Sequence, residues 1–211
     1  MSIIDGDAVN SGIDCADEYA SNYAKSHAKR DLTYNFEYMR EFTIDSLVPN
    51  YSILDIGCGT AGYYKHMKNC KHLVCLDGSK KMLDEAKILS KEFDIKDVTY
   101  ECCLFDEYDS STKFDIVNLG VYGHYIPHDL ETIKRAVSLV KDGGISVFSI
   151  STPVSLYTKI GVIVKNIITF GKAKTMFESK FEKMLKKANA GDIIIKLHRM
   201  PNRISYFVKK I

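Results

Sequence analysis

The sequence of 211 residues lacks several features that would assign it to a special class of protein. No run of about 20 uninterrupted apolar residues occurs, so no membrane-spanning helix is expected. Residues 1–17 contain acidic side chains but no Lys or Arg, whereas a secretory signal begins with basic residues before an apolar core. A charged fraction of 27% beside 45% hydrophobic residues excludes a mainly disordered chain. We therefore expect a globular, cytoplasmic protein.

The six cysteines lack the C-x-x-C spacing that is typical of a zinc site. Several of them lie within apolar runs, and in a reducing compartment such residues behave as small buried hydrophobic side chains. We expect that role rather than disulfide bonding for the cysteines at positions 15, 58, 70, 75, 102 and 103. The sequence predicts no metal site.

Charge is unevenly distributed along the chain, although the formal net charge is only +2. Residues 159–211 hold 13 basic and 3 acidic residues, a net charge of +10, whereas residues 1–158 carry −8. A basic quarter of this kind is typical of a segment that binds an anionic partner. Pairing with the acidic remainder of the same chain is the alternative, and we favour it.

Short apolar stretches alternate with helical stretches over residues 50–152. The expected strands are Tyr51–Ile56, His72–Asp77, Val98–Leu104, Phe114–Leu119 and Ile145–Ile150. The expected helices are Ala61–Asn69, Ser79–Glu92 and Asp129–Val140, the last closed by Lys141–Gly144 as a helix stop. Strands separated by helices predict right-handed crossovers and a parallel sheet that is covered on both faces.

The C-terminal part predicts a helix, Met176–Ala190, followed by two strands, Asp192–Leu197 and Ile204–Lys209. These strands lie close together in the sequence, so we expect an antiparallel hairpin at the sheet edge. The predicted fold class is α/β: a doubly wound, mostly parallel sheet of seven strands with an antiparallel last strand and helices on both faces.

Residues 153–175 interrupt this alternation with a helix-like apolar stripe that is flanked by lysines. A segment inserted there lies over the carboxyl ends of the strands, where open α/β sheets bind ligands. A helix packed on the core, a substrate lid, a dimer contact and a membrane-surface helix through residues 156–170 all remain open. We interpret the chain as one domain, with a helical cap (1–48), a ligand-binding core (50–152), this lid-like segment and a closing helix and hairpin (176–211).

The strongest local signal is the stretch Leu54–Gly62, LDIGCGTAG, which follows an expected strand and opens a helix. Its three glycines satisfy G-x-G-x-x-G, and Asp77 follows about 20 residues later, as expected for a ribose-binding acid. This pattern alone leaves a dinucleotide and an adenosyl ligand open. Asp55 favours the second, because a carboxylate repels a pyrophosphate and attracts a cationic group.

Four stretches, in this order, resemble the signatures of class I S-adenosylmethionine-dependent methyltransferases. They are Leu54–Thr60, Leu76–Ala86 (LDGSKKMLDEA), Lys113–Val117 (KFDIV) and Leu139–Ile145 (LVKDGGI). The resemblance covers about residues 50–152, and the closing helix and hairpin fit the same family. It implies a Rossmann-like fold, S-adenosyl-L-methionine as the cofactor and S-adenosyl-L-homocysteine as the product.

The resemblance also implies roles for single residues of the cofactor site. Residues lining the methionine end would be Asp55, Gly57 and Gly59. Those at the ribose and the adenine face would be Asp77, Gly78 and Met82. The turn at the adenine edge would comprise Cys103, Leu104, Phe105 and Asp106. Near the sulfonium would lie Leu119 and Gly120, and the N-terminal helix would add Tyr19 or Tyr23. The sequence departs from the family at Ala61, where a third glycine is common, and after the third strand, where the usual acid is not clearly placed.

The loop after the fourth expected strand holds the candidate catalytic residues, Tyr122 and His124. His124 is the candidate general base, because the ordinary pKa of histidine lies near neutral pH. A purely positional His124 and an aromatic box for a cationic acceptor are the alternatives. The loop lacks an Asn/Asp-Pro-Pro-aromatic run and a Pro-Cys pair, which disfavours methylation of base or glutamine amines and of pyrimidine carbon.

These absences favour a small molecule as the acceptor, methylated at N, O or C by in-line displacement. The basic quarter keeps RNA, protein or lipid open as alternative substrates, although nucleic acid is disfavoured because the chain has no added recognition domain. A non-catalytic, cofactor-binding partner subunit is a further alternative. A nicotinamide-dependent dehydrogenase fits least, because of Asp55 and the later signatures.

Overall fold

The structure is a computed structural model. It describes residues 13, 14, 16–18, 20, 50–62, 64, 70–119, 129–151, 178–200 and 203–211. These residues fall into two compact units, Met1–Ile116 and Val117–Ile211. Predictions for residues 33–47, for most of the expected helix 61–69 and for residues 153–175 lie outside the described residues.

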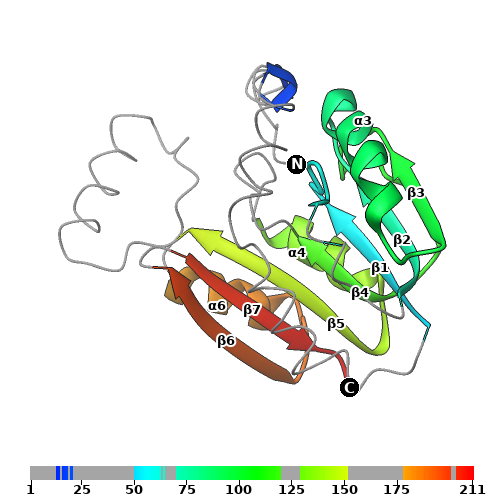
Figure 1. Ribbon diagram of the computed structural model, residues 1–211. Helices are drawn as coiled ribbons and strands as arrows, with labels where there is room; N and C mark the ends of the chain where they lie inside the picture. The colour runs from blue at the N-terminus through cyan, green and yellow to red at the C-terminus, as the bar shows by residue number, and fades with distance from the viewer. Residues whose placement is uncertain are drawn as a thin grey trace, which may run out of the picture. The chain divides into compact units, whose positions relative to one another are not determined.

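The first unit contains the parallel strands β1 (Tyr51–Ile56), β2 (Cys70–Leu76) and β3 (Asp97–Glu101), with β2 between the other two (Figure 1). In their register, Ile53 of β1 lies opposite Leu73 of β2. Both side chains are fully buried. Strands that are apolar on both faces are typical of a parallel sheet that is covered on both sides. The predicted strands at these positions are confirmed.

Helix α3 (Lys80–Leu89) follows β2 and continues into the short 3₁₀ helix η3 (Ser90–Glu92). It begins where predicted, because the Ser79 hydroxyl accepts a hydrogen bond from Met82 N at 3.1 Å and so caps the helix. Its buried face consists of Met82, Leu83 and Ala86. Strand β3 ends three residues before the predicted Leu104, because Leu104 already accepts a turn hydrogen bond from Glu107 N at 3.0 Å.

Strand β4 (Phe114–Leu119) has the predicted bounds. The Asp115 carboxylate, near its start, accepts hydrogen bonds from Ser52 N at 2.7 Å and from Ser52 Oγ at 2.8 Å. Ser52 lies at the beginning of β1, so this contact holds two strand starts together. The acid of the KFDIV stretch therefore has a structural role at the end of the strands opposite to the glycine turn.

The second unit contains β5 (Val140–Ser151), β6 (Ile193–Met200) and β7 (Arg203–Lys209). Strand β7 pairs antiparallel with both β5 and β6, with Phe207 opposite Val147 on one side and Ile195 on the other. The predicted hairpin is confirmed. The hydrogen-bonded strand order is β3-β2-β1-β4-β5-β7-β6, in which β4 belongs partly to each unit.

Helices α4 (Leu130–Ser138) and α6 (Glu178–Lys187) contact each other, and α4 also contacts β5. The Phe181 ring of α6 lies 5.8 Å from the Phe148 ring of β5 and 5.0 Å from the Tyr206 ring of β7, between centroids. Such distances are within the usual range for packed aromatic pairs. Figure 1 shows α6 lying along these strands. Phe181 thus fixes the closing helix on the sheet of this unit.

The prediction that Lys141–Gly144 stop a helix is wrong. Helix α4 ends at Ser138, and these four residues belong to β5. They extend the strand because the last residues of the chain pair with them: Gly143 N donates to Lys210 O at 2.9 Å, and Lys210 N donates to Gly144 O at 3.0 Å. The glycines look like a helix end in the sequence, whereas a distant strand decides their structure.

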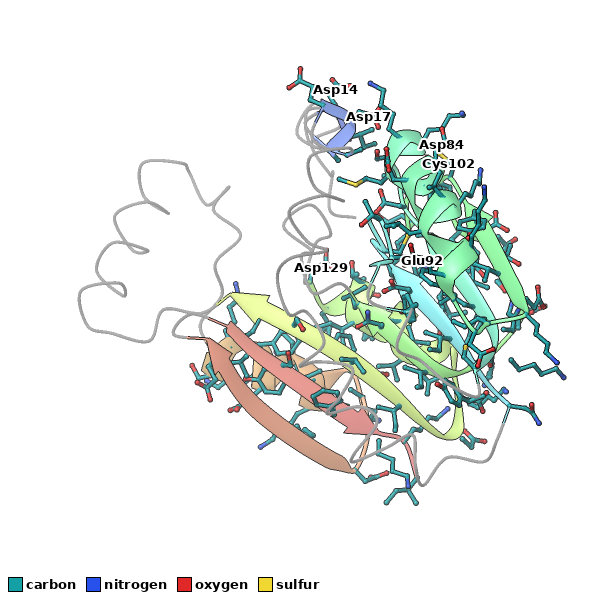
Figure 2. All side chains as sticks on the ribbon, viewed as in Figure 1. Asp14, Asp17, Asp84, Glu92, Cys102 and Asp129 are labelled. Carbon is teal, nitrogen blue, oxygen red and sulfur yellow. The ribbon has the colours of Figure 1, made fainter. Side chains whose placement is uncertain are left out.

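The Asp129 carboxylate caps α4 by accepting a hydrogen bond from Thr132 N at 2.8 Å (Figure 2). We expect Asp129→Ala to lower the free energy of unfolding by about 1 kcal/mol, because an unpaired amide remains at the helix start. That corresponds to a melting temperature about 2–4 °C lower for a chain of this size. Calorimetric melting measures it. Glu131→Ala is the control, because its exposed pair with Lys134 contributes only about 0.2–0.5 kcal/mol. Equal losses in both variants would contradict the capping role.

Three cysteines, Cys58, Cys70 and Cys75, are buried as predicted, whereas Cys102 is exposed and Cys103 is half-buried. The prediction is therefore wrong for the last two, because the chain leaves the sheet at Glu101 and carries them into a turn. Burial raises the pKa of the Cys70 thiol to about 12. Within the described part of the chain, no helix has the length and apolarity needed to cross a membrane.

Candidate functional site

The turn after β1 is built on three left-handed residues. Gly57 has a φ of 71°, Gly59 of 55° and Ala61 of 51°. Gly57 N and Cys58 N both donate to Leu76 O, at 2.8 and 3.1 Å, so the turn is fastened to the end of β2. A left-handed backbone explains why glycine is common at the third position. Ala61 keeps the same conformation at an energetic cost of about 1–2 kcal/mol.

Asp77 lies directly after β2 and accepts a hydrogen bond at each carboxylate oxygen. Gly59 N donates to Oδ2 and Ser79 N donates to Oδ1, both at 2.8 Å. Asp77 N in turn donates to Glu101 O at 3.1 Å, at the end of β3. One side chain therefore joins the turns that follow β1 and β2. Each oxygen can accept a further hydrogen bond, so the carboxylate is suited to two neighbouring hydroxyl groups.

The pKa of Asp77 is raised above its ordinary value. Desolvation of the carboxylate is the main cause, and the charge of Asp17 adds to it. The hydrogen bonds from Ser79 N and Gly59 N act in the opposite direction, because they stabilise the charged form. A carboxylate whose charge is only partly compensated by the protein is suited to additional hydrogen-bond donors from a ligand.

Asp55, at the end of β1, is fully buried. Its charge and that of Asp77 both contribute to raising the pKa of the Cys58 thiol, behind the larger effects of burial and of Cys75. Cys58 lies between the two acids in the sequence, in the glycine turn. The electrostatic environment of this turn is therefore negative, which favours a cationic group and disfavours a phosphate.

The start of α3 carries a contact that the sequence did not predict. The Ser79 hydroxyl donates to Asp17 Oδ1, and Lys81 N donates weakly to the same oxygen at 3.4 Å. Asp17 belongs to a helical stretch before residue 20 (Figure 2). Ser79 and Asp17 are 62 residues apart, so no local pattern could have indicated this pair.

The predicted adenine side is lined mainly by apolar side chains. Met82 is buried, and a side chain at Gly78 would meet Ile13 Cδ1 at 3.2 Å and Leu104 Cδ2 at 3.3 Å. The structure thus brings Leu104 and Ile13 close to Gly78, and Ile13 was not among the predicted residues. Close packing on both sides explains why position 78 holds a glycine.

The turn after β3 gives a mixed result. Phe105 is buried, with 6% of its surface exposed, so it belongs to the core below the turn. Asp106 is exposed, and Cys103 is half-buried. Burial raises the pKa of the Cys103 thiol, and the nearby charges of Glu101 and Glu107 add to this. Of the four predicted residues, Leu104 has the clearest position beside Gly78.

The other predicted residues divide into two groups. Leu119 ends β4 and is fully buried, within the second unit. Outside the described residues lie Tyr19, Tyr23, Gly120, Tyr122 and His124. Among the described residues, no group of three or more His, Cys, Asp or Glu side chains is arranged to hold a metal ion.

Residues 53–144 match the family model of a methyltransferase domain, which confirms the resemblance predicted from the sequence. No curated protein matches the chain. An S-adenosylmethionine-dependent methyltransferase from Clostridium acetobutylicum ATCC 824 is similar in structure, with a TM-score of 0.67 and 18% identity, and the match covers 93% of this chain and 99% of that one.

Two further solved structures are similar. For the N-methyltransferase NodS from Bradyrhizobium japonicum WM9, in complex with S-adenosyl-L-homocysteine, the TM-score is 0.66 at 11% identity, over 94% of this chain and 97% of that one. For magnesium protoporphyrin IX methyltransferase (ChlM) from Synechocystis PCC 6803, the TM-score is 0.62 at 17% identity, over 83% and 81%. These likenesses confirm the predicted Rossmann-like fold.

Proposed function

We propose that this chain, whose residues 53–144 form a methyltransferase domain, transfers a methyl group from S-adenosyl-L-methionine to N, O or C of a small-molecule acceptor. The observation that carries the proposal is the position of Asp77. It follows the second parallel strand, its two oxygens are held by Gly59 N and Ser79 N, and both can accept further hydrogen bonds.

The residues present fit this cofactor. Asp77 would accept hydrogen bonds from the two ribose hydroxyls. Gly57 and Gly59 have left-handed φ values and no side chain, so they would allow the methionine end to approach the backbone closely. Met82, Gly78 and Leu104 would provide an apolar surface for the adenine, since Met82 is buried and Leu104 lies close to Gly78. Buried Asp55 favours the cationic ammonium and sulfonium groups. The same charge disfavours the pyrophosphate of a dinucleotide.

S-adenosyl-L-methionine, when bound, supplies a methyl group already activated by its sulfonium. The protein then has to align the acceptor with the methyl group and exclude water. We propose that Tyr122 and His124 line the acceptor side and that His124 removes the proton of an amine or hydroxyl acceptor. Leu119 and Gly120 would lie near the transferred group. Tyr19 or Tyr23 would cover the cofactor from the N-terminal side.

Two considerations support a small-molecule acceptor. The solved neighbours include an N-methyltransferase and a methyltransferase named for magnesium protoporphyrin IX. The loop that follows β4 lacks the motifs of base and glutamine methylation.

The test is a thermal shift and calorimetric titration of the purified protein with S-adenosyl-L-homocysteine, S-adenosyl-L-methionine and NAD. A ligand at 100 times its Kd stabilises the folded protein by about 2.7 kcal/mol. For a chain of this size that raises the melting temperature by about 5–10 °C. We expect this shift with the two adenosyl ligands only. A shift with NAD alone would overturn the proposal.

A bound cofactor justifies an acceptor screen with a labelled methyl donor. Small amines, hydroxy compounds and carbon acids should be labelled, whereas RNA, protein and lipid vesicles should not. Cofactor binding without label in any acceptor would favour a non-catalytic partner subunit. Once an acceptor is known, the methylation rates of His124→Ala and His128→Ala should be compared. A large loss in His124→Ala alone would support His124 as the general base.

A further inference from the structure

The start of α3 receives a second protein segment beside the cofactor site. We call the described residues between 13 and 20 the N-terminal helical segment. Its Asp17 accepts a hydrogen bond from the Ser79 hydroxyl, and its Ile13 Cδ1 would lie 3.2 Å from a Cβ atom at Gly78. Gly78 and Ser79, the two residues that follow Asp77, are thus contacted from a part of the chain more than 60 residues away.

Ser79 is the common member of three hydrogen bonds. Its N–H donates to Asp77 Oδ1, its hydroxyl donates to Asp17 Oδ1, and the same hydroxyl accepts from Met82 N. The side chain is buried, with 1% of its surface exposed. A buried hydroxyl with both functions satisfied has a fixed orientation. A change in the position of Asp17 therefore changes the orientation of Ser79, whose N–H donates to Asp77.

We propose that Asp17 is a positioning residue of the cofactor site: by accepting the hydrogen bond from Ser79, it couples the docking of the N-terminal helical segment to ligand binding at Asp77. The inference rests on the proposed function, because it assigns a role at the same site. Docking brings Ile13 against Gly78, which Leu104 also approaches, so it adds an apolar side chain on the proposed adenine side. The coupling is reciprocal. If docking of the segment increases the affinity for the ligand by some factor, a bound ligand increases the equilibrium constant for docking by the same factor.

Charge provides the second part of the argument. The titratable groups that act on Asp77 or respond to it are Asp17, from the N-terminal helical segment, and Cys58, from the turn after β1. The negative charge of Asp17 raises the pKa of Asp77. Protonation of Asp77 removes acceptor capacity from the ribose site, so binding weakens as the pH falls through that pKa. Without the charge of Asp17, the weakening sets in at lower pH.

The experiment measures the Kd of S-adenosyl-L-homocysteine between pH 4 and 8 for the wild type and three variants. Asp17→Ala removes the acceptor, and we expect about fivefold to tenfold weaker binding at pH 7. Asp17→Asn keeps an acceptor oxygen and removes the charge. We expect its Kd at pH 7 to stay within about twofold of the wild type. The pH below which binding weakens, which we call the acid limit, should be lower than in the wild type.

Asp84→Asn is the matched control (Figure 2). Asp84 is an exposed carboxylate of α3, the helix that Asp17 contacts at its start, and it pairs with Lys80 at 3.2 Å. The substitution should change neither the Kd nor the acid limit. Hydrogen exchange adds a readout of docking. Ligand binding should slow exchange in the peptide that carries Asp17 in the wild type, and much less so in Asp17→Ala.

The outcomes separate the inference from the proposed function. Wild-type affinity and an unshifted acid limit in the Asp17 variants would overturn the inference and leave the proposed function intact. No binding of S-adenosyl-L-homocysteine by the wild type would overturn the proposed function, and the coupling with it. An equal effect of Asp84→Asn would show that loss of any acidic charge near α3 is sufficient, which also contradicts the inference.

Discussion

Asp77→Ala should weaken the binding of S-adenosyl-L-homocysteine about 100-fold or more, the largest effect expected at the site. A hydrogen bond to a charged group contributes about 1.5–3 kcal/mol, and the ribose would donate two of them to this carboxylate. Each 1.4 kcal/mol corresponds to about a factor of ten in the Kd. The substitution also releases Gly59 N and Ser79 N, so the two turns that surround the ligand lose their link.

Calorimetric titration at pH 7 measures this effect. Asp106→Ala is the comparison, because Asp106 was predicted at the adenine edge and its side chain is exposed. We expect Asp106→Ala to change the Kd by no more than about threefold, since exposed polar contacts contribute little. Comparable losses in both variants would contradict the central role of Asp77. A Kd unchanged by Asp77→Ala would show that the ribose is not bound there.

Gly191→Ala should reduce the free energy of unfolding by more than about 3 kcal/mol, a large part of the total stability of a typical domain. A Cβ atom at this position would lie 2.8 Å from the carbonyl carbon of Lys209 and 2.8 Å from Val208 Cγ1. The Lys209 carbonyl oxygen, which it would also overlap, accepts the hydrogen bond from Asp192 N at 3.0 Å. Relief of the overlap requires the hairpin of β6 and β7 to separate at its open end.

Gly143→Ala is the matched control in the same unit. Gly143 has a φ of 79°, but a Cβ atom there would have no neighbour within 4 Å. Its substitution should therefore cost only the strain of the left-handed backbone, about 1–2 kcal/mol. Urea unfolding measures both values. Equal costs would show that backbone conformation, rather than the overlap with Lys209, decides the effect at Gly191.

Local patterns predicted most of the elements correctly. The bounds of β1 and β4 follow from short apolar runs, and Ser79 begins α3 because its hydroxyl caps the first turn. The hairpin of β6 and β7 follows from two apolar runs on either side of Pro201. In each case the local residue pattern and the contacts with other parts of the chain favour the same structure. Such elements are recognisable in the sequence.

The failures have the opposite cause. Lys141–Gly144 look like the end of a helix, but pairing with Lys210 makes them a strand. The hydrogen bond between Ser79 and Asp17 was not predicted, because its two residues lie 62 positions apart in the sequence. Cys102 looks like a core residue because it follows an apolar run that ends sooner than expected. Contacts between distant parts of the chain decide all three, and no single sequence shows them.

The raised pKa of Asp77 has a consequence for the ligand-free protein. Its folded-state pKa lies above the ordinary value of about 3.9, so the folded protein holds this proton more tightly than the unfolded chain does. The stability from this group is fully present below the ordinary pKa and is lost as the pH rises through the folded-state value. At neutral pH the charged carboxylate of Asp77 in the empty site therefore lowers the free energy of unfolding. Hydroxyl groups of a bound ligand that donate to this carboxylate would stabilise its charged form, so ligand binding should offset this loss of stability at neutral pH.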